Sequence, residues 1–224
     1  ANWQRGVIAS FINGSYLKGD GANLAFGAGG KLLLTFMGGS LGFNYGECST
    51  GCTAPGGWTF VKLSNDALQP VLAVTPLGQP RIAVKLRATN VLAYLQCDSN
   101  CTQLASWSTP LELYMLRSER WALATDGQGR PRLAWNQGPT GVAGQEMNDE
   151  KVFYAWCDSG CTAATGWKGF DVGLAKKFGG EGLALALDPA GTPAIAHDNG
   201  TSPYGLSLAV CGTNCNTPTA AWAT

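Results

Sequence analysis

The chain has 224 residues, and its 15 Lys and Arg balance its 15 Asp and Glu, so the formal net charge is zero. Surfaces that bind nucleic acid or anionic membranes carry a basic excess, and this balance argues against both. Hydrophobic residues make up 45% of the chain, enough for a core, and no apolar run approaches the roughly 18 residues of a membrane span.

Eight cysteines form four pairs with the same C-x3-C spacing, separated from one another by 49, 60 and 54 residues: Cys48/Cys52, Cys97/Cys101, Cys157/Cys161 and Cys211/Cys215. One interpretation is a zinc site, but zinc motifs use C-x2-C or C-x4-C pairs that lie close together. The other is a disulfide across each strand-to-strand turn, which the even count and the turn-forming residues between partners, Asp98 and Asp158 among them, favour. Four disulfides imply an oxidising compartment, so we expect a secreted or cell-surface protein.

Each cysteine pair belongs to a repeat of about fifty residues. A Gly-containing turn and an apolar strand precede every pair, and a tryptophan follows it, at Trp58, Trp107, Trp167 and Trp222. The tryptophan intervals of 49, 60 and 55 residues follow the cysteine intervals, which indicates true repeats. The first strands are expected at 23–26, 71–74, 121–125 and 183–187, and the third strands at 42–45, 91–95, 152–156 and 206–210.

Each repeat therefore predicts a four-stranded antiparallel meander, which is the unit of a β-propeller blade. We expect an all-β chain with four blades in one domain over 1–224, at about 22–64, 65–114, 115–174 and 175–224. Strands such as 183–187 are apolar on both faces, as expected of strands buried between two blades.

The chain begins at Ala1 with no Met and no signal peptide, which fits a processed mature protein or a trimmed fragment. Residues 1–12 resemble a fourth strand, because Trp3 precedes Trp58 by 55 residues, while the fourth blade has little sequence left for its own. This N-terminal strand is expected to close the last blade. Two alternatives stay open: the chain is a piece of a longer propeller, or two chains join into one ring.

The Asp-x-x-Gly-x-Pro turns at 126–131 and 188–193, with the C-x3-C turn and the following Trp, resemble the repeats of secreted bacterial β-propeller proteins. They also resemble, distantly, the Asp-box turn of sialidases, although the Ser and Trp of a true Asp-box are not in place. Sialidases use an arginine triad and a Tyr/Glu pair. Arg81 and Arg132 lie at equivalent positions, which the repeat explains without catalysis. The resemblance implies fold and secretion, and no catalytic residue.

Candidate binding residues lie in the loops between second and third strands and in the links between blades, because variable loops on a rigid scaffold usually bind. These loops are expected at 37–40, 85–90, 136–151 and 197–205, with links at 10–21 and 173–181. The candidates are Lys85, Arg87, Asn136, Glu146, His197, Asp198, Tyr204, Tyr16 and Lys18. A merely solvated rim is the competing interpretation.

The only histidine, His197, is followed by Asp198. A base oriented by a carboxylate competes here with a simple hydrogen-bonding role, which we favour. No metal and no cofactor is expected, although calcium near Asp149 or Asp198 would indicate a metal-dependent lectin. The leading hypothesis is a secreted, non-enzymatic binding or assembly module for a glycan or protein partner, including a subunit of an extracellular structure. The alternative is a sialidase-like carbohydrate-active hydrolase, which needs two facing carboxyl groups.

Overall fold

The computed structural model describes residues 21–38, 42–115, 120–137, 150–176, 182–198, 205–217 and 219–223. In these ranges the chain forms sixteen strands: β1 (Asn23–Phe26), β2 (Leu32–Met37), β3 (Phe43–Cys48), β4 (Trp58–Ser64), β5 (Ala67–Val74), β6 (Pro80–Leu86), β7 (Val91–Gln96), β8 (Leu111–Met115), β9 (Trp121–Thr125), β10 (Pro131–Gln137), β11 (Glu150–Cys157), β12 (Trp167–Lys176), β13 (Leu183–Leu187), β14 (Pro193–Asp198), β15 (Leu206–Thr213) and β16 (Ala221–Ala223). Hairpin turns carry the short 3-10 helices η1 (Ala28–Gly30), η3 (Pro55–Gly57), η4 (Leu104–Ser106) and η5 (Ala164–Gly166).

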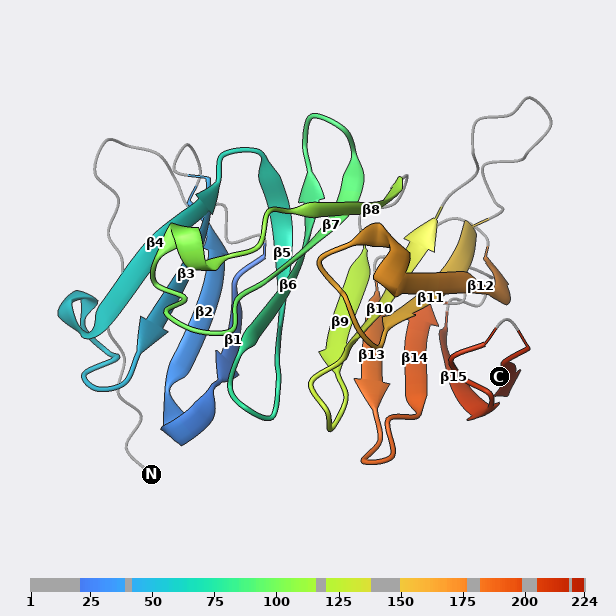
Figure 1. Cartoon of the computed structure of the whole chain (residues 1–224). Helices are drawn as coiled ribbons and strands as arrows, with labels where there is room; N and C mark the ends of the chain where they lie inside the picture. Colours follow the sequence, from blue (N-terminus) through green and yellow to red (C-terminus); the bar gives the residue numbers. More distant parts are fainter. Residues whose placement is uncertain are drawn as a thin grey trace. The chain divides into compact units, whose positions relative to one another are not determined.

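The strands form four antiparallel sheets, and each sheet consists of four strands that follow one another along the chain (Figure 1). The sheets are β1–β4, β5–β8, β9–β12 and β13–β16. Each repeat carries one C-x3-C disulfide. The predicted fold class, an all-β chain of four propeller blades, is confirmed. No helix in the described ranges has the length and apolar character needed to cross a membrane.

The described chain divides into two compact units, and each is considered by itself below. Unit 1 holds the described residues up to 89 together with 93–111, and unit 2 holds 90–92 together with those from 112 onward. The strands β7 and β8 thus have residues in both units. The single domain over 1–224 remains a prediction, and the closing strand expected at 1–12 lies outside the described residues. The fourth strand of the fourth sheet is β16.

The four cysteine pairs are all disulfides, and the bonded cysteines have Cα atoms 5.7 or 5.8 Å apart. The bonds join the two cysteines of each predicted pair: Cys48–Cys52, Cys97–Cys101, Cys157–Cys161 and Cys211–Cys215. No cysteine is left free, so the zinc interpretation is wrong.

The two cysteines of a bond differ in their surroundings. The first cysteine of every pair is buried, because it ends or nearly ends a third strand. The second cysteine lies in the turn, where Cys52, Cys161 and Cys215 are only half-buried and Cys101 is 5% exposed. Each bond therefore fixes a surface turn to the buried end of a strand.

The disulfide turns share one backbone design. The residue before each second cysteine has a positive φ of 53–66°. Glycine adopts this left-handed conformation freely and asparagine tolerates it, which explains the residue types found there: Gly51, Asn100, Gly160 and Asn214.

The tryptophan after each pair closes the same turn from the opposite strand. In the first three repeats its indole Nε1 donates a hydrogen bond of 2.8–2.9 Å to the carbonyl of the second cysteine, six residues earlier. In the fourth repeat the turn has one residue more, because Trp222 follows Cys215 by seven. Trp222 Nε1 has no hydrogen-bond partner among the described residues. The extra residue explains why the last tryptophan interval exceeds the last cysteine interval.

In the third and fourth sheets, the turn between the first two strands is held by an aspartate at its first position. The Asp126 carboxylate accepts hydrogen bonds of 2.9 Å from the amides of Gln128 and Arg130. Asp188 accepts bonds of 2.9 and 2.8 Å from the equivalent amides of its own turn. The glycine three residues on has a φ of 76° at Gly129 and 85° at Gly191. We call this the Asp turn. Its carboxylate accepts hydrogen bonds from two amides that would otherwise have no acceptor within the turn.

Neighbouring sheets pack face to face within each unit, as Figure 1 shows for β2 beside β5 and for β9 beside β13. In unit 1, Tyr45 of β3 meets Trp107 edge-on, with ring centroids 5.0 Å apart. In unit 2, Tyr154 of β11 meets Trp222 in the same way at 5.7 Å. The repeat therefore places a third-strand tyrosine of one blade against the tryptophan of the next.

Two details differ from the sequence prediction. Lys85, Asn136, His197 and Asp198 were expected in loops, but β6, β10 and β14 continue through them. Polar side chains do not end a strand when the backbone still pairs, as Asn136 does with Val152. The second difference is β13, which was expected to be buried on both faces. It exposes its alanines while its leucines are half-buried.

Candidate functional site

Buried charges of unit 2 gather at the turn end, by which we mean the end of a sheet that carries the turn between its first two strands and the disulfide turn. The side chain of Arg132 is 1% exposed, and its Nη2 donates to Asp126 and Asp158 at 2.9 Å each. Its Nη1 donates to the carbonyls of Pro131 and Cys157 at 3.1 and 3.0 Å. Arg132 thus ties the Asp turn to the disulfide turn of the same sheet.

Arg81 makes the equivalent tie in unit 1. Its Nη1 donates to the carbonyls of Pro80 and Cys97, both at 3.1 Å, and its Nη2 lies 2.8 Å from Asp98. Asp98 and Asp158, which the sequence assigned to turn formation, therefore also bind these guanidinium groups. Both arginines bind groups of their own hairpins. Their equivalent positions therefore reflect the repeat and a structural role.

The disulfide cysteines also belong to the turn end, and their contacts are those of a structural element. The carbonyls of Cys52 and Cys161 accept the indole hydrogen bonds of Trp58 and Trp167, both at 2.9 Å. Their sulfur atoms are bonded to the preceding cysteine of the pair and do not titrate. These cysteines shape the turns and supply no nucleophile or metal ligand.

The Asp126 carboxylate makes the stability of unit 2 depend on pH. Burial alone would raise its pKa, but hydrogen bonds from the amides of Arg130 and Gln128 and from the Arg130 guanidinium, together with the charge of Arg132, outweigh burial and lower it. A carboxyl group whose pKa is lower in the folded state stabilises the fold above its unfolded pKa of about 4, and this contribution is lost as the pH falls further.

We therefore expect the free energy of unfolding of unit 2 to fall below about pH 4. Asp126→Asn should lower the unfolding midpoint at neutral pH and flatten the acid dependence, as measured by denaturant titration at a series of pH values. The comparison is Asp188→Asn: amide hydrogen bonds, that of Thr192 first, also lower the pKa of this carboxyl group, but it is exposed and holds no buried arginine, so its loss should change the acid dependence less. An acid dependence that survives unchanged in Asp126→Asn would contradict this assignment.

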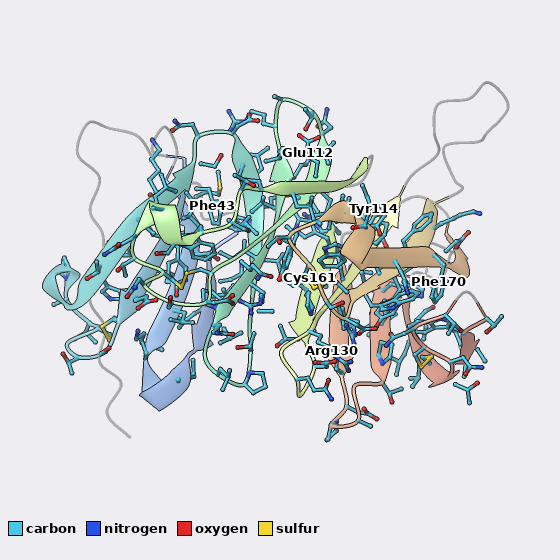
Figure 2. The ribbon with its side chains drawn as sticks, viewed as in Figure 1. Phe43, Glu112, Tyr114, Arg130, Cys161 and Phe170 are labelled. Carbon is cyan, nitrogen blue, oxygen red and sulfur yellow. A yellow bond between two sulfur atoms is a disulfide. The ribbon has the colours of Figure 1, made fainter. Side chains whose placement is uncertain are left out.

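The loop end is the opposite end of each sheet, where the second strand finishes and the third begins. In unit 2 the residues Trp135 and Asn136 stand there side by side in β10 and point to opposite faces of the sheet, because side chains alternate along a strand. Figure 2 shows Tyr114 and Arg130 toward opposite ends of this unit's sheets.

Three aromatic rings stack at the loop end. Trp135 is 1% exposed, and its ring lies between Tyr114 of β8 at 4.1 Å and Phe153 of β11 at 5.2 Å, measured between centroids. Gly169 makes room for this stack, since a Cβ there would lie 2.9 Å from the Tyr114 hydroxyl. Burial raises the pKa of Tyr114, so its hydroxyl stays protonated at neutral pH. The Trp135 Nε1 has no hydrogen-bond partner among the described residues.

An ion pair lies on the same face of the sheet as this aromatic stack (Tyr114, Trp135 and Phe153). Lys151 Nζ is 2.6 Å from the Asp171 carboxylate, with side chains 54% and 30% exposed. Asp171 is the cross-strand partner of Phe153, which is in turn the partner of Trp135. The loop end therefore places a largely buried stack of aromatic rings beside two partly exposed charged groups.

The other face of β10 presents Asn136, which is 2% exposed, to the layer between the third and fourth sheets. His197, 1% exposed, lies on the β14 face that packs into the same layer through Ile195. Both predicted residues are thus buried at the rim of one layer. Whether they contact a ligand remains a prediction.

The remaining candidates are dispersed. In unit 1, Lys85 is half-buried and Arg87 is exposed, and the Arg87 amide donates to the Asp66 carbonyl at 2.7 Å. Tyr16, Lys18, Glu146 and Tyr204 lie outside the described residues, and of Asp198 only the backbone is described. Asp149, the other residue considered for calcium, also lies outside them. In the described part of the chain, no three His, Cys, Asp or Glu side chains gather as metal ligands would.

Sequence reasoning missed Tyr114, Lys151 and Asp171. Tyr114 and Asp171 lie in fourth strands, where no binding residue was sought. Lys151 was considered only as the last residue of a loop. Lys151 and Phe153 are two positions apart in β11 and therefore lie on the same side of the strand, which was a usable signal.

Unit 1 also has a small cavity of about 190 Å³, lined by Leu63, Leu95, Leu104, Trp107, Ser108, Thr109 and Pro110. It is smaller than the roughly 300 Å³ of typical ligand pockets.

No family model and no curated protein sequence matches the chain. Its fold is similar to those of several carbohydrate-active proteins of propeller-like form. An ulvan lyase of family PL25 aligns with a TM-score of 0.58 and 12% identity over 91% of this chain and 57% of the lyase. The α-L-arabinofuranosidase from Lactobacillus brevis aligns with a TM-score of 0.56 and 12% identity over 95% of this chain and 74% of that enzyme.

An endo-1,4-β-xylanase from Bacteroides thetaiotaomicron aligns with a TM-score of 0.52 and 13% identity over 93% of this chain and 72% of the enzyme. A leech intramolecular trans-sialidase reaches a TM-score of 0.49, too low for any argument, and this chain spans 29% of it. At such identities the likeness concerns the fold alone.

Proposed function

We propose that this protein is a secreted propeller module that binds glycans without cleaving them, through the loop end of unit 2. The observation that carries the proposal is the aromatic stack of Tyr114, Trp135 and Phe153 beside the Lys151–Asp171 ion pair. Trp135 is buried in the stack, so a sugar would pack against the exposed parts of the half-buried Tyr114 and Phe153, and the charged groups beside them would bind its hydroxyl or carboxylate groups. Four disulfides support the secreted compartment.

Binding is favoured over hydrolysis by the ion pairs of three described acidic side chains of unit 2. Asp126 and Asp158 both hold Arg132 at the turn end, and Asp171 holds Lys151 at the loop end. Glycoside hydrolysis requires one carboxylic acid and one carboxylate facing each other at roughly 5–10 Å across the sugar. Asp126 and Asp158 lie close together, but the Arg132 guanidinium stands between them and Asp126 is 3% exposed, so this pair leaves no space for a sugar.

The test is equilibrium binding of ulvan, arabinan and xylan fragments, the polysaccharide classes named for the structural neighbours, measured by calorimetry. We expect Lys151→Ala to weaken binding at least about tenfold, since a hydrogen bond to a charged group contributes about 1.5–3 kcal/mol. Tyr114→Phe should weaken binding less, because it removes only the hydroxyl.

The matched control is Lys31→Ala. Lys31 forms an ion pair of the same 2.6 Å length with Glu47, but near the turn end of a sheet in unit 1. Equal loss of affinity in both variants, or no binding by the parent protein to any of the three, would contradict the proposed site. Release of new reducing ends during the incubation would instead favour the hydrolase alternative.

A further inference from the structure

One residue of unit 1 has a backbone conformation that its side chain does not favour. Gln69 in β5 has a φ of 47°, in the left-handed region. At every other described position with a positive φ the residue is glycine or asparagine, which adopt this conformation at little cost. Gln69 also precedes Pro70, and a proline restricts the residue before it to extended backbone. The backbone alone therefore does not explain why glutamine occupies this position.

The strained residue belongs to a β-bulge at the loop end of unit 1. The pairing of β5 with β6 shifts between Leu68 and Val71, so that Gln69 and Pro70 together lie opposite the single residue Val84. Bulges of this kind redirect a side chain, and they are over-represented beside functional sites.

The first strand of the neighbouring sheet holds the bulge in place. Asn23 Nδ2 donates hydrogen bonds of 2.6 Å to the Pro70 carbonyl and 3.2 Å to the Gly21 carbonyl. A Cβ on Gly21 would lie 3.0 Å from Pro70 Cδ and 3.1 Å from Gln69 Cα. Strained residues persist only where their surroundings determine them, and here the packing of β1 beside β5 does so (Figure 1).

Two cationic residues follow one another along the strand opposite the bulge. Lys85 pairs with the residue before Gln69, so the Lys85 and Gln69 side chains leave the backbone roughly 5–8 Å apart. Arg87 comes two residues later, and its amide donates to the Asp66 carbonyl at 2.7 Å. The Asp66 carboxylate accepts a 3.2 Å hydrogen bond from the Ala88 amide. Two cations and one carboxylate give this end of the sheet a net positive charge.

The polar groups beside the bulge are available to a ligand. In the described part of unit 1, Lys31 and Arg81 are ion-paired, whereas no described carboxylate lies within ion-pair distance of Lys85 or Arg87. The Gln69 amide has no hydrogen-bond partner among the described residues. Gln69 and Lys85 are half-buried and Arg87 is exposed, so solvent reaches all three.

We propose that Gln69, Lys85 and Arg87 form a second binding site, at the loop end of unit 1, for a saccharide that carries an acidic group. A glutamine amide both donates and accepts, as sugar hydroxyls require, and lysine and arginine bind carboxylate or sulfate groups. The strain at Gln69 then has a functional reason, because sequences break local backbone rules mainly at functional sites. The site shares no residue with the one proposed in unit 2.

The experiment is calorimetric titration of the full chain with oligogalacturonate, whose sugars carry carboxylates, and with neutral dextran oligosaccharides. Oligogalacturonate should bind more tightly than dextran, and its affinity should fall as salt screens the two cations. Gln69→Gly should weaken binding about two- to tenfold, the effect of losing a neutral hydrogen bond. Lys85→Ala should weaken it about tenfold or more, because it removes a charged one. Lys151→Ala, in unit 2, should leave this binding unchanged.

The glycine variant separates loss of binding from loss of fold. Glycine accepts a positive φ, so Gln69→Gly should unfold at or above the melting temperature of the parent while it binds more weakly. The control is Asn100→Gly, which places glycine at a φ of 53° in the disulfide turn of unit 1 and should leave binding unchanged. A parent protein that does not bind oligogalacturonate overturns the proposal. So does binding that survives in Gln69→Gly but is lost in Lys151→Ala, which would assign the saccharide to unit 2.

Discussion

Replacing Arg132 by methionine should destabilise unit 2 by about 3 kcal/mol, the lower part of the range for a broken buried ion pair. The guanidinium is 1% exposed, and its removal leaves Asp126, 3% exposed, without its buried partner. The carbonyls of Pro131 and Cys157 lose their donor at the same time. The loss stays near the lower limit because Arg130 Nε still lies 2.6 Å from Asp126. Denaturant unfolding measures it, and hydrogen exchange of residues 126–132 locates it.

Arg130→Met is the matched control for this result. Arg130 contacts the same carboxylate, but its side chain is 35% exposed, so its loss should cost about 1 kcal/mol or less. Equal destabilisation by Arg130→Met and Arg132→Met would mean that the tie between the two turns does not depend on the buried guanidinium.

Trp107→Ala should destabilise unit 1 by about 3–5 kcal/mol, the usual range for truncating a buried tryptophan. Trp107 is 9% exposed and packs edge-on against Tyr45 of the neighbouring sheet. It also donates a 2.8 Å hydrogen bond to the Cys101 carbonyl. The substitution thus opens a cavity between two sheets and loosens the disulfide turn, which thermal unfolding and exchange of residues 97–107 would report.

The repeat supplies an internal comparison for this prediction. Trp222 meets Tyr154 in the same edge-on geometry, but it is only half-buried and its Nε1 has no hydrogen-bond partner among the described residues. Trp222→Ala should therefore cost clearly less than Trp107→Ala. A larger effect at Trp222 would show that packing against the tyrosine, and not closure of the turn, determines the contribution of these tryptophans.

The sequence was most informative where one local interaction repeats. The four cysteine pairs with Gly or Asn before the second cysteine define a turn whose geometry depends on a few neighbouring residues, and the structure has that turn four times. Strand positions followed from the same landmarks. The predicted ends of β10 and β14 were less accurate, because Asn136 and His197 resemble loop residues although backbone pairing includes them.

The candidate site was harder to predict because it depends on contacts between distant segments. Tyr114 reaches Trp135 from β8, twenty-one residues earlier, and Lys151 pairs with Asp171 across two strands. No local pattern specifies such contacts. The ion pairs of the two buried arginines were easier to predict. Arg81 and Arg132 were recognised as equivalent, but their partners Asp98 and Asp158 were considered only as turn residues.

Each covalent link joins cysteines only four positions apart within one hairpin. Eight thiols allow about a hundred different pairings, yet closing a short loop requires far less chain entropy than closing a long one. Loop-closure entropy in the unfolded polypeptide therefore favours the native partner of each cysteine over the distant ones. A gene that gains or loses a whole repeat leaves no thiol unmatched, so this architecture can change its number of repeats by duplication without new cysteine pairing.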